Sequence, residues 1–344
     1  GYLSYWVGQI GYLSARQGFA LLLALYTPLA PASPPATSSS AHPYPSSRLG
    51  PAPEQVWWVE TDGEGELWSN GLRVLTAYET RTERRSYVRF PRRAGPPIPA
   101  GETPAGIVYH TSEGEIIPFQ PDLNQEILSK TQGLLGWLRR RDTYNYFIDR
   151  FGQVYRIVID SDIAGHAGMS IWADDDHYYL NLNDSFLGVC FETHWDPDAG
   201  DGELLTLAQI QAALSLTDML RARYGIRDQN CVPHGLISVN PQKMLIGYHV
   251  DWAKGFPFRA LGLTDKYEVP PPSMLDFGFG YDGHLIQTLN GQLWPGLDLA
   301  QRALEQRAEA QGMSLPALRR DLQNRYQESV ELLRTVKESL EAAP

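Results

Sequence analysis

The fold is decided by the stretch FLGVCFE at residues 186–192, in which Leu187–Phe191 form a continuous apolar run. A run of this length, bounded by polar residues, is typical of a strand that is buried on both faces of a sheet. Strand and helix signals alternate on both sides of it, from Gly106 to Leu263. The sequence therefore predicts an α/β fold with this strand near the centre of the sheet.

The neighbouring elements follow from periodicity and turn residues. Ile107–Tyr109 predicts a short buried strand, and two further strands flank the predicted hairpin turn at residues 150–153. Helices are predicted over Leu123–Arg141 and Leu205–Tyr224. The second helix is expected to end at Gly225, because glycine is common directly after a helix.

Composition divides the whole chain into five parts. The central part, residues 104–263, carries the alternating pattern. The other four are a signal-like segment at 1–32, a Pro/Ser-rich linker at 33–54, a small β region at 55–95 and a mostly helical C-terminal extension at 264–344. Hairpin signals at Asp62-Gly63 and Asn70-Gly71 support the small β region.

The signal-like segment contains the apolar run Phe19–Ala30, which is twelve residues long. A membrane-spanning helix needs roughly 20 apolar residues, so this run is too short to be one. It follows Arg16 and ends at Ala30-Pro31-Ala32, which fits a secretory signal with a small-residue cleavage site. We therefore expect a secreted, periplasmic or cell-envelope protein; the alternative interpretations are a buried apolar strand and an uncleaved anchor.

The formal net charge of −11 argues against a general nucleic-acid binder, which would carry a basic surface. One local exception is a cluster of six arginines: Arg81, Arg84, Arg85, Arg89, Arg92 and Arg93. This arginine cluster is interpreted either as a solvated strand and linker or as a contact with an anionic polymer. The sequence implies no stable protein partner.

The chain has only two cysteines, which excludes a disulfide-rich scaffold. Cys190 lies within the apolar run and is predicted to be a small buried hydrophobic residue. Cys231 lies three residues before His234 and is an alternative metal ligand.

Four of the eight histidines lie beside predicted strand ends or in loops, namely His110, His166, His234 and His249. A single histidine is more often a core or surface residue than a ligand, but four in such positions favour a site. Catalytic zinc sites use three protein ligands of this kind and leave the fourth position to water. No helical His-Glu-x-x-His motif is present, so the ligands would have to converge from distant segments.

Two acidic groups are interpreted as solvated carboxylates rather than metal sites. The first is the run Asp174–Asp176 with His177, which falls in a predicted loop. The second consists of Asp196, Asp198 and Asp201, whose spacing differs from that of an EF-hand loop.

From Gly106 to Phe258 the chain resembles the type 2 N-acetylmuramoyl-L-alanine amidases, a superfamily that includes the peptidoglycan recognition proteins. The resemblance rests on short motifs in the same order. They are Val108-Tyr109-His110-Thr111-Ser112, the Tyr-x-Tyr-Phe-Ile-Asp-x-x-Gly run at 144–152, His166-Ala167-Gly168, Gly188-Val189 with Glu192, a helix with Gln209 and Gln211, and Pro233-His234-Gly235. The resemblance implies a mixed, mostly parallel central sheet flanked by helices, with the zinc in a groove at one side.

By the same resemblance, His110 and His234 match the two zinc histidines of the family. Asp251 matches the third ligand through the Phe256-Pro257 that follows it, although Trp252 replaces the family's Pro. Asp251 lies 17 residues after His234, so the loop would carry an insertion. His249 falls where the family has a Lys, and it is the alternative third ligand.

The resemblance also implies catalytic roles. Glu192 resembles the catalytic glutamate, which would act as general base; otherwise it is a surface carboxylate at a strand end. Tyr144 matches an active-site tyrosine, and it or His249 could donate a hydrogen bond to the oxyanion; otherwise Tyr144 is a packed aromatic. His166 is expected to line the substrate groove rather than bind metal.

These assignments predict a Zn²⁺-dependent enzyme that hydrolyses the amide bond between N-acetylmuramic acid and L-alanine in peptidoglycan or a muropeptide. Two other functions stay open. One is a peptidoglycan-binding module without catalysis, which the long interval between His234 and Asp251 favours. The other is a zinc peptidase that cuts within the stem peptide.

Overall fold

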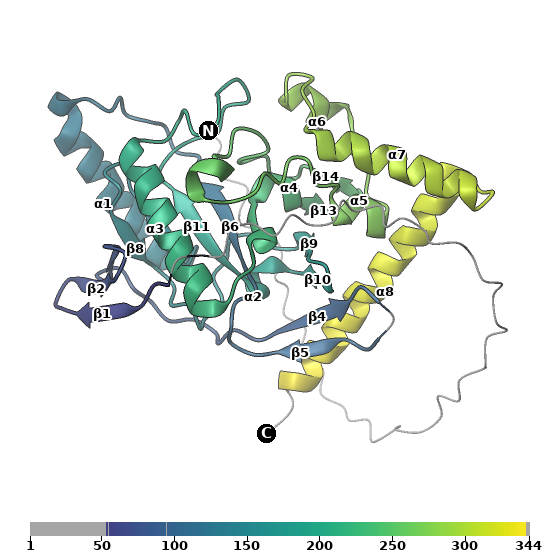
Figure 1. Cartoon of the computed structure of the whole chain (residues 1–344), viewed down its shortest axis with the longest axis horizontal. Helices are drawn as coiled ribbons and strands as arrows, with labels where there is room; N and C mark the ends of the chain where they lie inside the picture. Colours follow the sequence, from purple (N-terminus) through teal and green to yellow (C-terminus); the bar gives the residue numbers. More distant parts are fainter. Residues whose placement is uncertain (1–52, 54, 94, 342–344) are drawn as a thin grey trace. The chain divides into compact units, whose positions relative to one another are not determined.

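The central sheet has eight strands in the order β1-β2-β3-β8-β7-β11-β6-β12 (Figure 1). The apolar run that predicts the fold forms β11 (Phe186–Phe191), between β7 (Tyr146–Ile148) and β6 (Gly106–Thr111). Strand β11 pairs in parallel with both neighbours, and β6–β12 and β3–β8 are also parallel. The pairs β1–β2, β2–β3 and β7–β8 are antiparallel. The predicted mixed, mostly parallel sheet is therefore confirmed.

The structure is a computed structural model that describes residues 53, 55–93 and 95–341. The predicted signal-like segment and nearly all of the linker lie outside the described residues. The remaining strands are β1 (Trp58–Thr61), β2 (Gly65–Trp68), β3 (Arg73–Leu75), β4 (Tyr87–Pro91), β5 (Ile98–Ala100), β8 (Val154–Arg156), β9 (Ile171–Ala173), β10 (His177–Leu180), β12 (Cys231–Pro233), β13 (Val239–Asn240) and β14 (Leu245–Ile246). The helices are α1 (Asn124–Arg141), α2 (Leu182–Ser185), α3 (Leu207–Tyr224), α4 (His234–Ile237), α5 (Pro272–Phe277), α6 (Gly283–Thr288), α7 (Pro295–Ala310) and α8 (Leu315–Glu341), with short 3-10 helices at Pro121–Leu123, Asp228–Asn230 and Phe258–Leu261.

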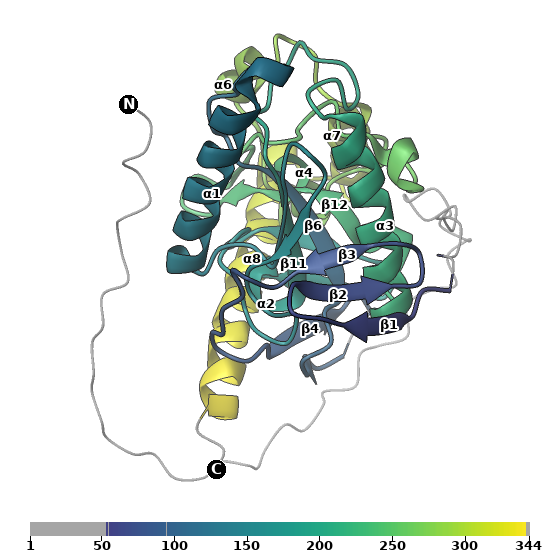
Figure 2. The same cartoon turned by 90° about the vertical axis from the view of Figure 1, so that its left-hand side faces the viewer.

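Helices α1 and α3 cover opposite faces of the central sheet (Figure 2). Because successive side chains of a strand point to opposite faces, Tyr109 and His110 belong to different layers. The Tyr109 hydroxyl hydrogen-bonds to Thr217 of α3 at 2.8 Å. On the other face, Cys190 packs with Leu135 of α1, and Cys190 is the residue of β11 that pairs with His110. His110 therefore lies on the face of the sheet that α1 covers.

The start of α3 is tied to the ends of the central strands. Thr206 and Gln209 form a reciprocal capping box, in which each side chain bonds to the backbone of the other residue. The Gln209 amide also donates to the carbonyl oxygens of Ile148 and Glu192, at 3.3 and 3.2 Å. At the other end, Gly225 has a φ of 66°, so the helix stops in the left-handed conformation that glycine adopts without strain. The sequence prediction of this helix and its end is confirmed.

The strands of the predicted small β region do not form a separate sheet; they belong to two sheets that also contain strands from later in the chain. Strands β1–β3 continue the central sheet through the β3–β8 pair. Strands β4 and β5 join β10 and β9 in a second sheet of order β5-β4-β10-β9. The limits of the predicted domains stay predictions.

Most of the arginine cluster ties these strands to the rest of the protein. Arg85 is only 1% exposed, and Arg92 donates to the carbonyl oxygen of Asp174 at 3.0 Å. Arg81 pairs with Asp162 at 3.0 Å, and Arg84 pairs with Glu102 at 2.6 Å. The interpretation of the cluster as a solvated strand is thus wrong for Arg85.

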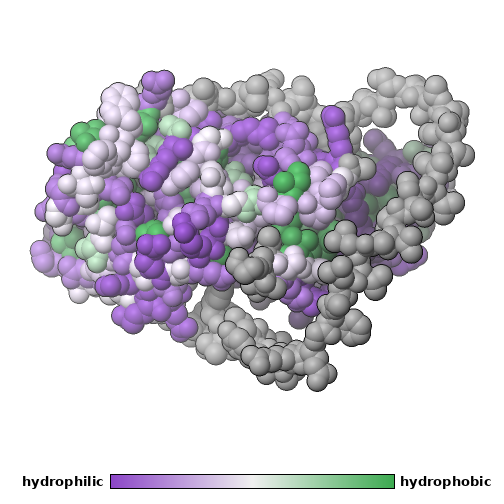
Figure 3. Space-filling model, turned by 90° about the horizontal axis from the view of Figure 1, so that it is seen from below, coloured by the Kyte–Doolittle hydropathy of each residue, from purple (hydrophilic) through white to green (hydrophobic). Residues whose placement is uncertain are grey.

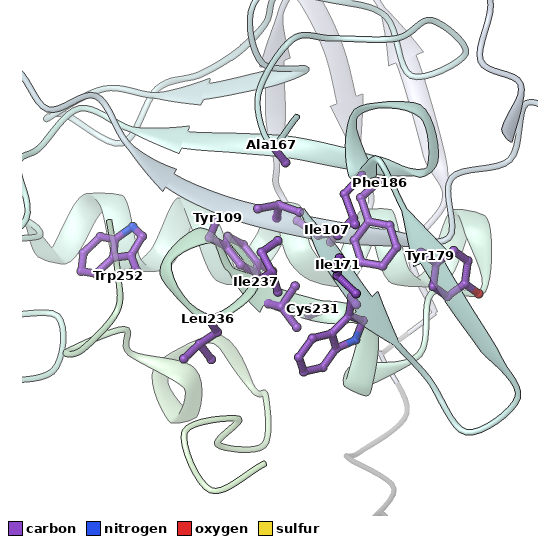
Figure 4. Packing of buried hydrophobic residues seen from close by; sticks show 14 of the residues in the cluster. Ile107, Tyr109, Ala167, Ile171, Tyr179, Phe186, Cys231, Leu236, Ile237 and Trp252 are labelled. Atoms are coloured by element: carbon purple, nitrogen blue, oxygen red, sulfur yellow. The ribbon is translucent and has the colours of Figure 1, made fainter. Parts of the chain in front are cut away.

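The hydrophobic core continues from β6 and β12 into the loops beyond the central sheet. Figure 4 shows Ile107 and Tyr109 of β6 packed near Cys231, Ile237 and Phe186. The C-terminal helices add to this core, since α5 packs against α7, α8 and β9, and α8 also contacts β4. The predicted mostly helical C-terminal region is therefore a packed part of the fold.

The surface seen from below is mainly hydrophilic, with isolated hydrophobic residues (Figure 3). Within the described ranges, no helix combines the length and the apolar character that crossing a bilayer requires. Exposed aromatic side chains occur at the start of strand β1: its first residue, Trp58, is 55% exposed, and Trp57 just before the strand is 61% exposed.

Candidate metal centre

The predicted ligands His110, His234 and Asp251 come from three separate segments and meet at one place. His110 lies near the end of β6, and His234 opens α4 directly after the adjacent strand β12. Because β6 and β12 are parallel neighbours, their carboxyl ends bring these two residues together. Asp251 is in the loop that follows β14, and its carbonyl oxygen accepts a hydrogen bond from the Gly235 N–H at 2.8 Å. This bond holds the Asp251 loop against the first turn of α4.

The donor atoms of these three side chains fit a divalent cation. They lie within 4.8 Å of one another, and all three residues are buried. The Asp251 carboxylate faces His110 Nδ1 at 3.2 Å through Oδ2 and His234 Nδ1 at 2.9 Å through Oδ1. Two imidazole nitrogens and one carboxylate make the donor set that zinc takes in open catalytic sites.

The electrostatics of the cluster keep His110 and Asp251 in the forms that bind metal. Burial, and after it the neighbouring His234, lowers the pKa of His110 to about 4, so His110 is neutral at pH 7. Burial alone would raise the pKa of Asp251, but His234 and His110 outweigh it and hold that pKa far below its usual range. A neutral imidazole and an ionised carboxylate are the protonation states that coordinate a metal.

His166 lies behind His110. Its side chain is buried, its Nδ1 lies 3.1 Å from His110 Nε2, and its Nε2 lies 3.1 Å from the carbonyl oxygen of Phe186. The backbone N–H groups of residues 166–168 all donate to the Asn183 side chain, at 2.7–2.9 Å, which fixes this loop. His110 and the backbone thus contact both ring nitrogens of His166, and the expectation that His166 lines the substrate groove stays a prediction.

His249 and Tyr144 lie beside the cluster. The His249 ring stacks on His234, with centroids 4.9 Å apart and an interplanar angle of 25°. Burial, and then His234, lowers the pKa of His249 to about 4. The Tyr144 ring lies 5.0 Å from the His110 ring, on a backbone with a φ of 60°, which is uncommon outside glycine. His249 is not part of the group of donor atoms formed by His110, His234 and Asp251.

Glu192 is held by its own hydrogen-bond partners and is not in the group of donor atoms formed by His110, His234 and Asp251. Both carboxylate oxygens accept from Thr131 Oγ1, at 2.9 and 2.8 Å, and one also accepts from the Arg150 N–H at 3.2 Å. It lines a narrow pocket of about 30 Å³ with Ile127 and Lys130. In the β11–β6 register, the residue opposite His110 is Cys190, two positions before Glu192. The predicted role of Glu192 as a base stays a prediction.

Glu113, whose pKa is affected by the charge of Asp251, is not among the residues that the sequence motifs identify. Glu113 follows His110 by three residues, has a φ of 52°, and its carboxylate accepts a hydrogen bond from Thr111 Oγ1. Desolvation by surrounding protein raises the pKa of Glu113 to about 6, with the charge of Asp251 adding to the increase, although the residue remains exposed. Strained backbone near a reactive group is a recurrent property of active sites. The only sequence signal was its position just after the His-Thr-Ser motif.

The other possible metal ligands, Cys231 and the acidic run at residues 174–177, do not belong to the His110 group. Cys231 is fully buried and does not belong to the His110 group, and burial raises its pKa to about 12, which disfavours the thiolate that a metal would need. Asp174 lies near Asp176 and His177, but its carboxylate already accepts hydrogen bonds from both of their backbone N–H groups and pairs with Arg227 at 3.1 Å. The acidic run therefore has a structural explanation.

Comparison with known proteins relates this part of the chain to one family. A family model described as N-acetylmuramoyl-L-alanine amidase matches residues 100–251. The chain is 33% identical over 94 residues to N-acetylmuramoyl-L-alanine amidase AmiD of Escherichia coli (strain K12). This match covers 26% of this chain and 32% of AmiD. The chain thus spans about a third of the length of that curated relative.

Two solved structures are similar over larger parts of the chain. One is AmiD from E. coli in complex with the substrate anhydro-N-acetylmuramic acid-L-Ala-D-gamma-Glu-L-Lys. It has 20% identity and a TM-score of 0.38, and the match covers 60% of this chain and 91% of AmiD. The other is AmpDh3 from Pseudomonas aeruginosa, with 19% identity and a TM-score of 0.38, which covers 63% of this chain and 96% of AmpDh3.

Proposed function

We propose that residues 100–251, which match a family model described as N-acetylmuramoyl-L-alanine amidase, form a domain of that kind and that this protein is a zinc-dependent peptidoglycan amidase. It would hydrolyse the amide bond between the lactyl group of N-acetylmuramic acid and the L-alanine of the stem peptide. The observation that carries the proposal is the convergence of His110, His234 and Asp251 within that domain. The substrate is peptidoglycan or a muropeptide derived from it.

Each group has a part in the proposed reaction. His110, His234 and Asp251 would hold the zinc ion, which supplies an activated water and polarises the scissile carbonyl. The water oxygen adds to the carbonyl carbon, the carbon–nitrogen bond breaks, and the leaving amine takes up a proton. Tyr144 and His249 flank the ligands and could donate hydrogen bonds to the developing oxyanion.

A carboxylate would take the proton from the water and return it to the amine. The sequence resemblance favours Glu192, while exposure and the raised pKa favour Glu113. The carboxylate of Glu192 is satisfied by Thr131 and the Arg150 N–H, whereas Glu113 is exposed and feels the charge of Asp251. A general base works best when its pKa lies near the working pH, which suits the raised pKa of Glu113.

The pH dependence of the reaction should separate these two carboxylates. A base acts in its deprotonated form, so a Glu113 base predicts that kcat/KM rises with pH through about 6 and then levels off. Glu113→Gln should remove this limb and lower kcat/KM by about 10²–10⁴-fold, whereas Glu192→Gln should leave the limb in place. The matched control is Glu115→Gln, which alters a carboxylate two residues along the same loop. A limb near pH 6 that survives in Glu113→Gln and vanishes in Glu192→Gln would return the role to Glu192.

The proposed activity can be tested on purified muropeptides. Metal analysis should find about one zinc per chain, and a chelator should stop the release of stem peptides. Mass analysis of the products should show N-acetylmuramic acid with a free lactyl carboxylate. Full activity after complete removal of zinc would contradict the metal-dependent mechanism.

The same measurement distinguishes the other candidate functions. A peptidoglycan-binding module would retain the muropeptides without cleaving them at any zinc concentration. A zinc peptidase would leave L-alanine attached to the muramic acid and release shorter peptides. The grouping of three possible ligands, His110, His234 and Asp251, favours a catalyst over a binding module, because catalytic zinc sites use three protein ligands and leave one position open.

We also propose that the protein works in the cell envelope or outside the cell, where its substrate is found. The support is the signal-like pattern of Arg16, the apolar run Phe19–Ala30 and the small residues that follow. Fractionation of cells that express the full-length gene checks this location. Accumulation in the cytoplasm alone would contradict it.

A further inference from the structure

Arg150 is a buried cation with few hydrogen-bond partners. The residue is 8% exposed, so most of its side chain is shielded from water. Its Nη1 donates to the carbonyl oxygen of Ile117 at 3.2 Å, while its Nε is buried without a hydrogen-bond partner in the described part of the chain. A guanidinium has five N–H donors, and a buried donor that makes no hydrogen bond costs free energy. Arg150 therefore has donors available for a ligand.

Glu192 contacts the backbone of Arg150 and not its guanidinium. One Glu192 oxygen accepts from the Arg150 N–H at 3.2 Å, and both oxygens accept from Thr131 Oγ1. The Phe119 ring lies 5.2 Å from the guanidinium carbon, which orients the group without offering a hydrogen-bond acceptor. Buried charges in proteins are normally paired, so this guanidinium is suited to an anionic ligand.

The guanidinium belongs to a residue that lines the narrow pocket beside Glu192. Lys130 adds a second positive charge to this pocket, and the other carboxylate in its lining, Glu115, is exposed. The pocket measures about 30 Å³. A water-sized atom needs about 10–15 Å³ of such space, so the pocket has room for roughly the two oxygens of a carboxylate. A carboxylate is also the anion whose geometry matches a guanidinium.

The strand register gives the position of this pocket relative to the metal centre. Cys190 of β11 pairs with His110 of β6, and Glu192 follows Cys190 by two residues on the same face of the sheet. Two residues of a parallel strand span about 7 Å. The pocket therefore lies about 7 Å from His110, towards the carboxyl ends of the strands.

We propose that Arg150 binds a carboxylate of the stem peptide, the one on the residue that follows L-alanine. The inference rests on the proposed function, which places the scissile amide at the metal centre. An extended peptide advances by about 3.3–3.6 Å per residue, so the second stem residue lies about 7 Å beyond the scissile bond. This length matches the separation between His110 and the pocket. Arg150 is thus a specificity-determining residue, which recognises the charge of the stem without touching the reacting atoms.

The backbone of Arg150 is held independently of its side chain. Its N–H donates to Glu192 at 3.2 Å, and its carbonyl oxygen accepts from Thr206 Oγ1 at 2.8 Å. A replacement of the side chain leaves both bonds available. Recognition of the stem can therefore be removed without removing the hydrogen bonds of Glu192.

The test compares two muropeptides that differ in one group. In both, a γ-linked glutamate follows L-alanine; its α-carboxyl group is free in one and a primary amide in the other. The enzymes are the zinc-loaded protein, Arg150→Met, which keeps much of the side-chain length, and Arg150→Lys, which keeps the charge. The control is Arg325→Met, because Arg325 of α8 also lies over an aromatic ring, that of Tyr178 at 5.4 Å, but does not line the pocket.

The parent should cleave the carboxylate form with a kcat/KM about 10–100-fold higher than that of the amide form. The difference should lie mainly in KM, because the contact is remote from the reacting atoms and strengthens the binding of substrate and transition state alike. In Arg150→Met the ratio of the two kcat/KM values should fall to about one. Arg150→Lys should keep part of the preference, and Arg325→Met all of it. Zinc content should be the same in all four proteins.

A folded Arg150→Met that keeps the full preference would overturn the proposal, as would a parent that cleaves both muropeptides with equal kcat/KM. If Arg150→Met does not fold, Arg150→Gln takes its place with the same expected loss of preference. A parent that cleaves neither muropeptide would refute the proposed function, and calorimetry then decides on Arg150. Tighter binding of the carboxylate form would support the assignment in that case, and equal binding of the two forms would refute it.

Discussion

Asp251→Ala is expected to lose both zinc and amidase activity. Its carboxylate is the group that contacts both candidate histidine ligands, at 3.2 and 2.9 Å, and no other carboxylate belongs to this set of donors in the described structure. The variant leaves two histidines, which is one ligand fewer than catalytic zinc sites use. Metal analysis after dialysis should find zinc near zero per chain, where the parent retains about one.

His249→Ala is the matched comparison, because His249 is two residues away and contacts His234 by stacking. We expect it to retain zinc and to lose about 10²–10³-fold in kcat, the usual effect of removing one oxyanion donor. The two variants exchange phenotypes if His249 is the third ligand. Zinc lost from His249→Ala but kept in Asp251→Ala would therefore reverse the assignment without affecting the fold.

Arg85→Met should destabilise the protein by about 4 kcal/mol or more. The Arg85 guanidinium donates to five backbone carbonyl oxygens, those of Asp160, Asp162, Asn183, Asp184 and Phe186, at 2.8–3.2 Å. Methionine fills much of the volume but donates no hydrogen bond, so the carbonyl oxygens of Asp160, Asn183 and Asp184 lose their side-chain donor. Those of Asp162 and Phe186 keep a second partner, Asn145 and His166. Each buried unsatisfied carbonyl costs about 1–3 kcal/mol, so even partial relaxation leaves a large loss.

The measurement is the free energy of unfolding from denaturant titration of the zinc-free protein. Arg84→Met is the control, since the neighbouring Arg84 is exposed and pairs with Glu102 on the surface. Surface ion pairs contribute about 0–1 kcal/mol, so the control should change stability only slightly. Equal, small changes in the two variants would contradict the role assigned to Arg85.

The burial of Arg85 shows where sequence patterns stop being informative. Six arginines in a short stretch look alike in composition, and only the fold reveals that Arg85 is buried against carbonyl groups of the 160–162 loop, helix α2 and the start of β11. Burial lowers its pKa to about 10, which still leaves it charged at neutral pH. The five carbonyl partners of Arg85 lie 75 to 101 residues further along the chain, so the local spacing of the arginines does not reveal them.

Local patterns were sufficient where a single segment decides its own structure. The apolar run at Leu187–Phe191 predicts β11, and the periodicity of Leu205–Tyr224 predicts α3 to within two residues. The turn at residues 150–153 predicts the β7–β8 hairpin, which is confirmed. These elements depend on side-chain alternation and turn chemistry, both of which a sequence displays directly.

The candidate site was predictable in its ligands but not in its surroundings. His110, His234 and Asp251 follow from motif order, and the structure brings their donor atoms together. The position of Glu192 relative to His110 could not be predicted from the motifs, because it depends on how β11 and β6 are aligned. In the observed alignment the residue beside His110 is Cys190. The burial of His166 and the exposure of Glu113 depend on packing between segments, which motif order does not describe.

The order of strands in the central sheet also affects how the chain reaches its native state. The parallel pair β11–β6 joins Phe186 to Gly106, and β12 must then dock on the far side of β6. Pairings between distant segments require large loops to close first, which slows folding. During that delay the edge strand β1, with Trp57 and Trp58 exposed, offers unpaired backbone groups and apolar surface to other chains. Slow refolding and aggregation that begins at this edge are the expected difficulties when the protein is produced at high concentration.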